Sequence, residues 1–221
     1  MIVVHHLNNS RSQRVLWMLE ELELPYEVRR YERLPSFQAP PELKAVHPLG
    51  KSPVLQDGAV VVAESGAILE YLVETYGRGR LGPPADPEGR NRYRYFMHYA
   101  EGSLMPVLLL RLLFGNLPRR VPWLMRPVTR MIAGGVEAGL IRPQIAQHFG
   151  FLEAELKDRD WFAGPDLTAC DVQMSFPLYA AAARGALDDR MPRLAAFVKR
   201  VEARPAWQRA IERGGPFEIL R

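Results

Sequence analysis

The chain has 221 residues, of which 48% are hydrophobic and 24% charged. This balance is typical of a folded globular protein and excludes a disordered or fibrous one. Its single cysteine, Cys170, excludes an intramolecular disulfide, a multi-cysteine zinc site and a paired-cysteine redox centre. The net charge is +4, and because the basic surplus is spread over the chain after residue 80 we expect no nucleic-acid partner.

Two features bear on location. The first residues, MIVVHHLNN, place no basic segment ahead of a long apolar stretch, so we expect no secretory signal and a cytoplasmic protein. The longest apolar stretch, residues 104–114, is too short to cross a bilayer and contains Pro106 and Arg111. We therefore interpret it as a buried helix and expect no membrane partner.

Residues 1–76 alternate short strand patterns with short helical ones. The β-branched run at 2–7 predicts a buried strand, and apolar residues at helical spacing predict a helix from about residue 10–12 to Pro25. The remaining elements that we expect are a strand at 26–30, a helical turn at 42–46, a hairpin at 53–63 turning at Asp57-Gly58, and a helix from Glu64 or Ser65 to Tyr76.

Glycine and proline cluster between residues 77 and 89, after which strand patterns stop. The rest of the chain is helical in pattern, so the sequence predicts an α/β unit followed by an all-α unit. The expected helices cover 90–114, one or two segments within 121–156 interrupted at Pro127 and Pro143, a segment from Thr168 toward Ala186, 192–203, and a last one from Pro205.

Serines stand where the first strand gives way to the first helix, in Ser10-Arg-Ser12-Gln-Arg14. Free backbone N–H groups and the helix dipole favour a negative charge there, and a serine hydroxyl can donate one more hydrogen bond. Ser10 or Ser12 can equally act as a helix cap.

Three further motifs follow along the chain. His47-Pro-Leu-Gly-Lys-Ser-Pro-Val-Leu55 leads into the third strand, and Glu64-Ser-Gly-Ala-Ile-Leu-Glu-Tyr-Leu72 opens a helix whose N-terminus can bind an anion. Thr168-Ala-Cys-Asp171 has the form of a capping box, for which we expect a structural role.

With this order of elements, the motifs resemble the cytosolic glutathione transferases over nearly the whole chain, in particular the bacterial serine-type or theta-like ones. The resemblance implies a thioredoxin-like domain with a mixed four-stranded sheet at 1–80, a linker at 81–89 and an all-helical domain at 90–221. It also implies a homodimer.

The resemblance further implies a glutathione site. Ser10 would stabilise the thiolate, with Asn9 and Ser12 as competitors. Pro53 would follow a cis bond, so that the backbone of Ser52, which replaces the usual valine, contacts the cysteinyl part of glutathione. Residues implied for the two ends of glutathione are Lys51 for the glycyl carboxylate, Ser65 for the γ-glutamyl carboxylate and Glu64 for the γ-glutamyl ammonium.

The second substrate would be a small hydrophobic electrophile held against the helical domain. Candidates for its pocket are Met105, Leu108, Phe114 and Trp123, while Glu101 and Ser103 are candidates for reaching glutathione across a dimer interface. The five histidines are scattered, so we expect no metal site.

The leading hypothesis is conjugation of glutathione, as co-substrate, to hydrophobic electrophiles. One alternative uses the same site for glutathione-dependent reduction of peroxides or disulfides. Another keeps the scaffold as a non-catalytic ligand-binding or partner-binding protein.

Overall fold

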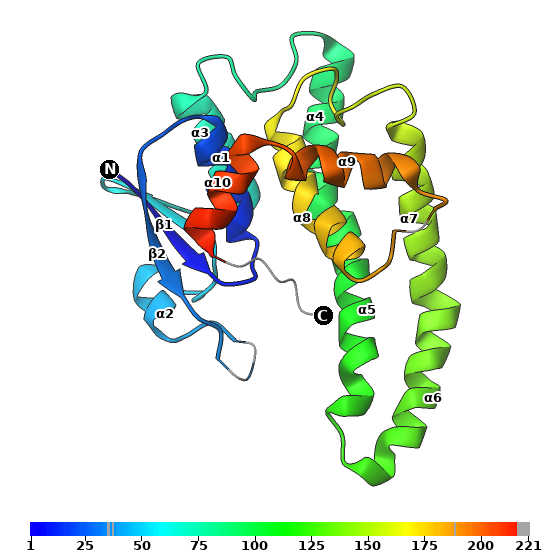
Figure 1. The fold of residues 1–221 in the computed structure, drawn as a ribbon. Helices are drawn as coiled ribbons and strands as arrows, with labels where there is room; N and C mark the ends of the chain where they lie inside the picture. The colour runs from blue at the N-terminus through cyan, green and yellow to red at the C-terminus, as the bar shows by residue number, and fades with distance from the viewer. Residues whose placement is uncertain (35, 37, 188, 216–221) are drawn as a thin grey trace.

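The computed structural model describes residues 1–34, 36, 38–187 and 189–215, and consists of a small mixed sheet with its helices beside a larger helical bundle (Figure 1). The sheet has the order β2-β1-β3-β4, in which β1 (Ile2–Leu7) pairs in parallel with β2 (Tyr26–Tyr31) and antiparallel with β3 (Val54–Asp57). Strand β4 (Val60–Ala63) completes it. All six residues of β1 are buried, as expected for a β-branched run in a central strand covered on both faces.

The predicted hairpin is confirmed, but its turn lies one residue later, at Gly58 and Ala59. Gly58 adopts a φ of 58°, a left-handed conformation that costs glycine little. Asp57 ends β3 instead, and its carboxylate accepts hydrogen bonds from Tyr71 and Tyr76. These bonds fasten the hairpin to helix α3 (Ser65–Tyr76), which packs beside α1 (Ser12–Glu21), while the short α2 (Glu42–Val46) follows β2.

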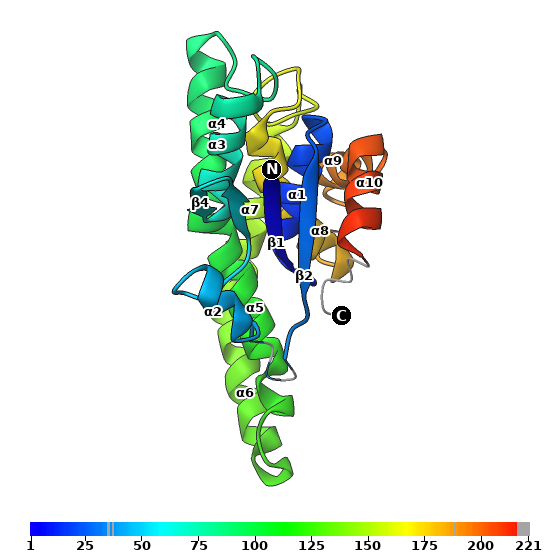
Figure 2. The ribbon, with the colours of Figure 1, turned by 90° about the vertical axis from the view of Figure 1, so that its left-hand side faces the viewer.

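The bundle is dominated by two long antiparallel helical runs, which form a hairpin extending beyond the rest of the molecule (Figures 1 and 2). Pro106 and Pro143 lie at the start of the second part of each run, directly after a wide π-helical turn. Proline has no N–H to donate to the preceding turn, and a π turn accommodates that loss without breaking the helix. The first run comprises α4 (Pro87–Tyr99), η1 (Ala100–Leu104) and α5 (Met105–Asn116); the second comprises α6 (Arg126–Val136), η4 (Glu137–Ile141) and α7 (Arg142–Glu155).

Helix α8 (Ala169–Ala183) crosses the middle of the bundle and is almost entirely buried. The capping box at its start is confirmed, because the Asp171 carboxylate accepts hydrogen bonds from the Thr168 N–H at 2.9 Å and from the Phe162 N–H at 2.7 Å. Cys170 lies beside it, and burial raises the pKa of its thiol well above the usual range. A buried thiol with a raised pKa is chemically inert.

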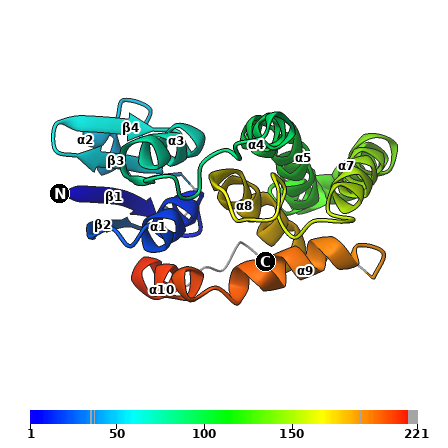
Figure 3. The ribbon, with the colours of Figure 1, turned by 90° about the horizontal axis from the view of Figure 1, so that it is seen from above.

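The last two helices, α9 (Pro192–Glu202) and α10 (Pro205–Gly214), run along one side of the molecule. Helix α10 does not stay with the bundle but returns to α1 and β2 (Figure 3). Arg209 and Arg213 form ion pairs with Glu20, and Arg204 pairs with Glu21. Helix α10 thus packs on the sheet unit.

Candidate active site at the start of helix α1

A chain of buried hydrogen bonds joins the serines after β1 to a histidine within it. The Oγ atoms of Ser10 and Ser12 are 2.7 Å apart, and the Ser12 Oγ is 2.8 Å from Nδ1 of His6. The Ser12 N–H also donates to the Ser10 Oγ, at 3.2 Å. All three side chains are buried, so their protons are shared among themselves more than with water.

The protonation state of His6 determines which groups donate and which accept in this series of hydrogen bonds. Burial, and then the charge of Arg30, lower the pKa of His6 to about 4 against a raising hydrogen bond to the backbone of Gly214. A neutral ring that donates to a carbonyl through one nitrogen accepts at the other. Ser12 therefore donates to His6, and Ser10 donates to Ser12.

Three guanidinium groups, those of Arg11, Arg14 and Arg33, surround this junction. Oε1 of Glu101 accepts from Arg11 Nε at 2.8 Å and from Arg14 at 2.7 Å. Burial lowers the pKa of Arg33, and the charge of Arg11 lowers it further. The four groups carry two more positive than negative charges, which favours an anion bound at the start of α1.

Arg14 connects four elements. Its side chain is only 1% exposed, and one terminal nitrogen donates to the Ser65 Oγ of α3 at 3.0 Å and to the Gln173 Oε1 of α8 at 3.1 Å, as well as to Glu101 of η1. Burial lowers its pKa to about 10, so it stays charged at neutral pH. Its Nε and second terminal nitrogen are buried without a partner among the described residues.

The loop before β3 is tied to β1 by Ser52. The Ser52-Pro53 bond is cis, as the resemblance implied. The Ser52 hydroxyl donates to the carbonyl of His5 at 2.8 Å and accepts from the N–H of Leu7 at 3.1 Å. The serine that replaces valine therefore has a structural role, while neighbouring Lys51 is exposed.

Glu64 and Ser65 lie at the N-terminus of α3. Glu64 has a φ of 72°, a strained conformation for a residue other than glycine, and its side chain is exposed. Ser65 is buried and accepts from Arg14. The first N–H groups of a helix have no intrahelical acceptor, so this end of α3 can bind a carboxylate.

Asn9 shares the junction with Ser10. Its φ is 49°, and its side-chain oxygen is buried without a partner among the described residues. Arg33 donates to the carbonyls of Asn8 and Asn9, which holds this left-handed turn in place.

The four residues predicted for the electrophile pocket differ in their exposure to solvent. Met105 and Leu108 belong to the hydrophobic core and Phe114 is half-buried against it, whereas Trp123 is exposed where α5 gives way to α6. A role of any of them in an electrophile pocket stays a prediction, because apolar residues at helical spacing look alike whether they face a core, a pocket or solvent.

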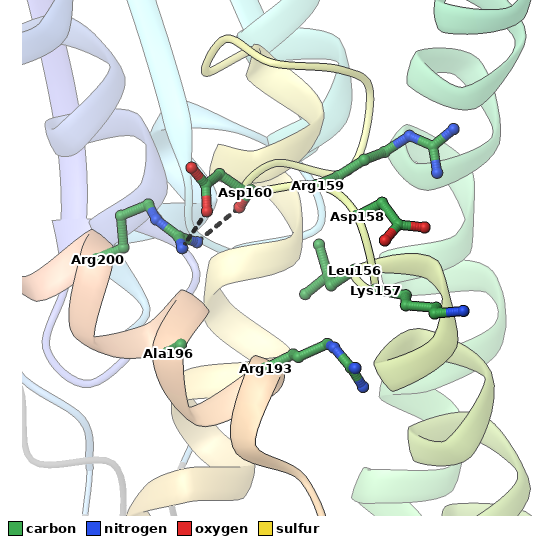
Figure 4. A pocket seen from close by; sticks show the side chains of 8 residues that line it. All are labelled: Leu156, Lys157, Asp158, Arg159, Asp160, Arg193, Ala196 and Arg200. Carbon is green, nitrogen blue, oxygen red and sulfur yellow. Dashed lines mark hydrogen bonds and ion pairs between the residues drawn. The ribbon is translucent and has the colours of Figure 1, made fainter.

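A cavity of about 360 Å³ lies elsewhere, between the loop after α7 and helix α9 (Figure 4). Charged side chains line most of it, and Arg200 donates to the backbone and carboxylate of Asp160 there. A smaller one, of about 210 Å³, lies between α3 and α4 and includes Glu70, Arg90 and Tyr93. Neither cavity is lined by the residues at the start of α1, namely Ser10, Arg11, Ser12, Arg14 and Arg33.

Glu101 pairs with arginines of its own chain. Burial raises the pKa of its carboxyl, but the charges of Arg14 and Arg11 and their hydrogen bonds outweigh burial and lower it. Its side chain is 32% exposed, and Ser103 follows it in the same π-helical turn. A contact of either residue across a dimer interface stays a prediction.

Sequence reasoning missed the roles of His6 and Gln173. His6 lies four residues before Ser10, and a histidine this close to two serines is a signal for a shared hydrogen bond. Gln173 lies 159 positions after Arg14, and no local sequence pattern indicates the hydrogen bond between them. Within the described part of the chain, no cluster of three or more histidine, cysteine, aspartate or glutamate side chains could hold a metal ion.

Comparison with known proteins decides the family. Residues 1–74 match the family described as glutathione S-transferase, N-terminal domain, and residues 136–205 match glutathione S-transferase, C-terminal domain. Glutathione S-transferase 3 of Schizosaccharomyces pombe is 35% identical over 213 residues, which cover 96% of this chain and 88% of the relative. This chain belongs to the glutathione S-transferase family.

Further relatives agree. Glutathione S-transferase 1 of Saccharomyces cerevisiae is 32% identical over 225 residues, covering 96% of this chain and 94% of the relative. A crystal structure of a glutathione S-transferase from Actinobacillus pleuropneumoniae superposes with a TM-score of 0.78 at 31% identity, covering 99% of this chain and 95% of that one. The thioredoxin-like domain with a helical C-terminal domain, predicted from sequence, is thus confirmed.

Proposed function

We propose that this transferase joins the thiolate of glutathione to small hydrophobic electrophiles, with a serine-type, theta-like site at the start of α1. The observation that carries the proposal is the cluster of Arg11, Arg14 and Arg33 at the junction of β1 and α1, where the hydroxyl of Ser10 is buried. A free thiol has a pKa of about 8.5 and is only a few per cent ionised at neutral pH. A surplus of positive charge beside the sulfur lowers that pKa and raises the fraction of the nucleophile.

The reaction needs no group beyond the two substrates. The thiol proton leaves to solvent, the sulfur forms a bond to the electrophilic carbon, and the displaced electron pair departs with the leaving group or moves to the adjacent atom. The protein adds proximity, since it holds both reactants in one geometry.

Glutathione would span the sheet unit. We assign the backbone of Ser52, after which Pro53 is cis, to its cysteinyl part and Lys51 to its glycyl carboxylate. The start of α3 would bind the γ-glutamyl group, with Ser65 and the free N–H groups on the carboxylate and Glu64 on the ammonium. The buried contact of Ser65 with Arg14 supports this assignment, because it places a cation behind that carboxylate.

Ser10 can donate a hydrogen bond to the glutathione sulfur only if its hydroxyl proton points away from Ser12. Its oxygen can keep the hydrogen bond from the Ser12 N–H while its proton points to the thiolate. Ser12 keeps His6 as acceptor throughout. The competing donors are Asn9, whose side chain stands at the same junction, and Ser12 itself.

Matched serine variants test the assignment. We expect Ser10→Ala to lower turnover with an activated aryl halide by about 100-fold, as loss of one hydrogen-bond donor to a developing anion does. Glutathione affinity by calorimetry should change little, while the pKa of the bound thiol, followed by thiolate absorbance, should rise. Ser12→Ala is the control and should leave the thiol pKa near the wild-type value.

The outcomes separate the alternatives. A Ser10→Ala variant with wild-type turnover, together with an inactive Asn9→Ala variant, would move the sulfur-side role to Asn9. Glutathione binding without turnover of electrophiles but with peroxide or disulfide reduction would favour the reductase. No binding at millimolar glutathione would leave a non-catalytic scaffold.

The remaining assignments follow the family. We propose a cytoplasmic homodimer in which Glu101 and Ser103 lie near the partner's glutathione, with the linker at residues 81–89, of which the last three form the start of α4. Light scattering of the purified protein gives its mass in solution and tests the dimer directly.

A further inference from the structure

The turn between the two long helical runs exposes large apolar side chains. We call residues 113–132 the hairpin tip; it contains η2 (Leu117–Arg119), η3 (Trp123–Met125) and the start of α6, and it forms the far end of the protruding hairpin (Figures 1 and 2). Trp123 is 75% exposed, Leu124 71% and Met131 72%. The other exposed apolar side chains of the tip are Leu113, Met125, Val128 and Ile132.

Helix α6 buries small side chains and exposes large apolar ones, which is the reverse of an ordinary amphipathic helix. Its buried residues are the small Thr129 and Ala133, one turn apart, whereas Val128, Met131 and Ile132 face outward. A helix of a soluble protein normally turns its largest apolar side chains to the core. A contiguous exposed apolar surface on a soluble protein usually marks an interaction site.

The tip is also the basic part of the molecule. Residues 113–132 contain four arginines and no acidic residue, a charge of +4 that equals the net charge of the whole chain, so the other 201 residues together carry none. Arg119, Arg126 and Arg130 are exposed within the tip. The surplus that the sequence analysis treated as spread out is therefore concentrated on the same surface as the exposed apolar residues.

We propose that the hairpin tip docks on an anionic lipid bilayer surface, with Trp123, Leu124 and Met131 entering the headgroup region and the arginines binding lipid phosphates. Tryptophan favours this interface because its ring is apolar and its N–H is polar. Basic side chains around an inserted apolar face are the general pattern of surface-bound helices.

Charge argues against the two other occupants. A second copy whose own tip packed against this one across a two-fold axis would bring two arginine-rich surfaces of like charge together. A nucleic acid would satisfy the arginines but leave the apolar side chains in contact with phosphates.

The tip would lie on the bilayer rather than cross it, so the proposal departs from the expectation of no membrane partner, which considered only a spanning segment. The helical run Pro87–Arg119 is long and apolar enough to span a membrane by length and composition, but its first half, α4, packs against α8 in the bundle. The tip also falls outside residues 1–74 and 136–205, the two segments that match the transferase family. The inference therefore does not rest on the proposed enzyme activity.

Tryptophan fluorescence gives a selective readout. Of the four tryptophans, Trp17, Trp161 and Trp207 are buried, so Trp123 is the one whose surroundings change when the tip meets lipid. We expect the whole protein to sediment with vesicles of equal parts phosphatidylglycerol and phosphatidylcholine, with emission shifted to shorter wavelength and quenched by brominated acyl chains. Vesicles of phosphatidylcholine alone should bind much less.

Variants test which side chains are responsible. Arg126→Gln with Arg130→Gln should weaken partitioning about 25-fold, since each arginine near an anionic surface contributes about fivefold. Leu124→Ser with Met131→Ser should abolish the emission shift while Trp123 remains as reporter. Arg90→Gln with Arg94→Gln, two exposed arginines of α4 at the opposite end of the hairpin, is the matched control and should bind as the wild type does.

Three results would overturn the proposal. The first is no sedimentation with anionic vesicles, and the second is binding that the tip variants leave unchanged, which would place the lipid contact elsewhere. The third is a Trp123 emission that is already at short wavelength without lipid and moves to longer wavelength on dilution, because a second copy of the chain then covers the tip. Thermal melting of each variant confirms that it is folded.

Discussion

The start of α1 and the hairpin tip are opposites in the side chains that they bury and expose. At the start of α1, the buried guanidinium of Arg14 and the buried hydroxyls of Ser10 and Ser12 lie inside the protein. At the tip, Trp123 and Leu124 lie in solvent. Each arrangement costs free energy by itself, because a buried charge loses its hydration and an exposed apolar group orders water.

The two regions differ in what offsets this cost in free energy. The buried polar groups of the site are held by partners within the chain, since Arg14 has acceptors on η1, α3 and α8. The structure provides no comparable cover for the tip among the described residues, where α6 makes its main contacts with its own hairpin. A polar interior thus indicates a site built by the fold, and an apolar exterior indicates a surface completed by a partner.

The largest effect that we expect is a difference in stability between variants of the two arginines that bind Glu101. Arg14→Ala should lower the free energy of unfolding by about 4 kcal/mol, because it breaks a buried ion pair and removes the donor from Ser65 and Gln173. Arg11→Ala should cost less than about 1 kcal/mol, because its side chain is 38% exposed. Denaturant unfolding of both variants measures the contrast, and equal losses would show that Arg14 is not the centre of the network.

Local chemistry explains which parts of the molecule the sequence predicted. The strand at 2–7, the capping box at Asp171 and the end of α3 each depend on a few neighbouring residues, and they lie where expected. The family resemblance supplied the cis bond before Pro53.

Contacts between distant segments were harder to predict. Arg14 was noticed for its spacing from Ser10, but its bonds to Glu101 and Gln173 join residues 87 and 159 positions apart. The return of α10 to the sheet unit is of the same kind. The exposure of the electrophile candidates was hard to predict for another reason, because hydrophobicity alone does not tell the buried Leu108 from the exposed Trp123.

A second, somewhat smaller effect concerns His6 and pH. Its pKa is about 4 in the folded protein and about 6.5 when unfolded, so between these values the unfolded chain binds the proton and the folded one does not. Stability is therefore lost as pH falls from about 6.5 toward about 4, by up to about 3 kcal/mol. Urea unfolding across this range should show a shallower loss for His6→Asn, which keeps an acceptor for Ser12.

The same measurement has an internal check. Burial raises the pKa of Asp171 to about 6, which has the opposite sign, since stability then falls as pH rises from about 4 toward about 6. This contribution is present in both proteins and cancels in their difference. Parallel curves for wild type and His6→Asn would mean that His6 is charged in the folded state, and the proton order from Ser10 to Ser12 to His6 would then be wrong.

The smallest expected effect is the sharpest test of the tip. Leu124→Ala should change the free energy of unfolding by less than about 0.5 kcal/mol, because an exposed side chain gains little from folding. Leu178→Ala, which removes the same atoms from the buried face of α8, should cost about 2–5 kcal/mol. A loss above about 1 kcal/mol for Leu124→Ala that grows with protein concentration would mean that the tip is buried against another copy before any lipid is present. The contrast between the two regions would then be one between a site enclosed within a chain and a surface enclosed between chains.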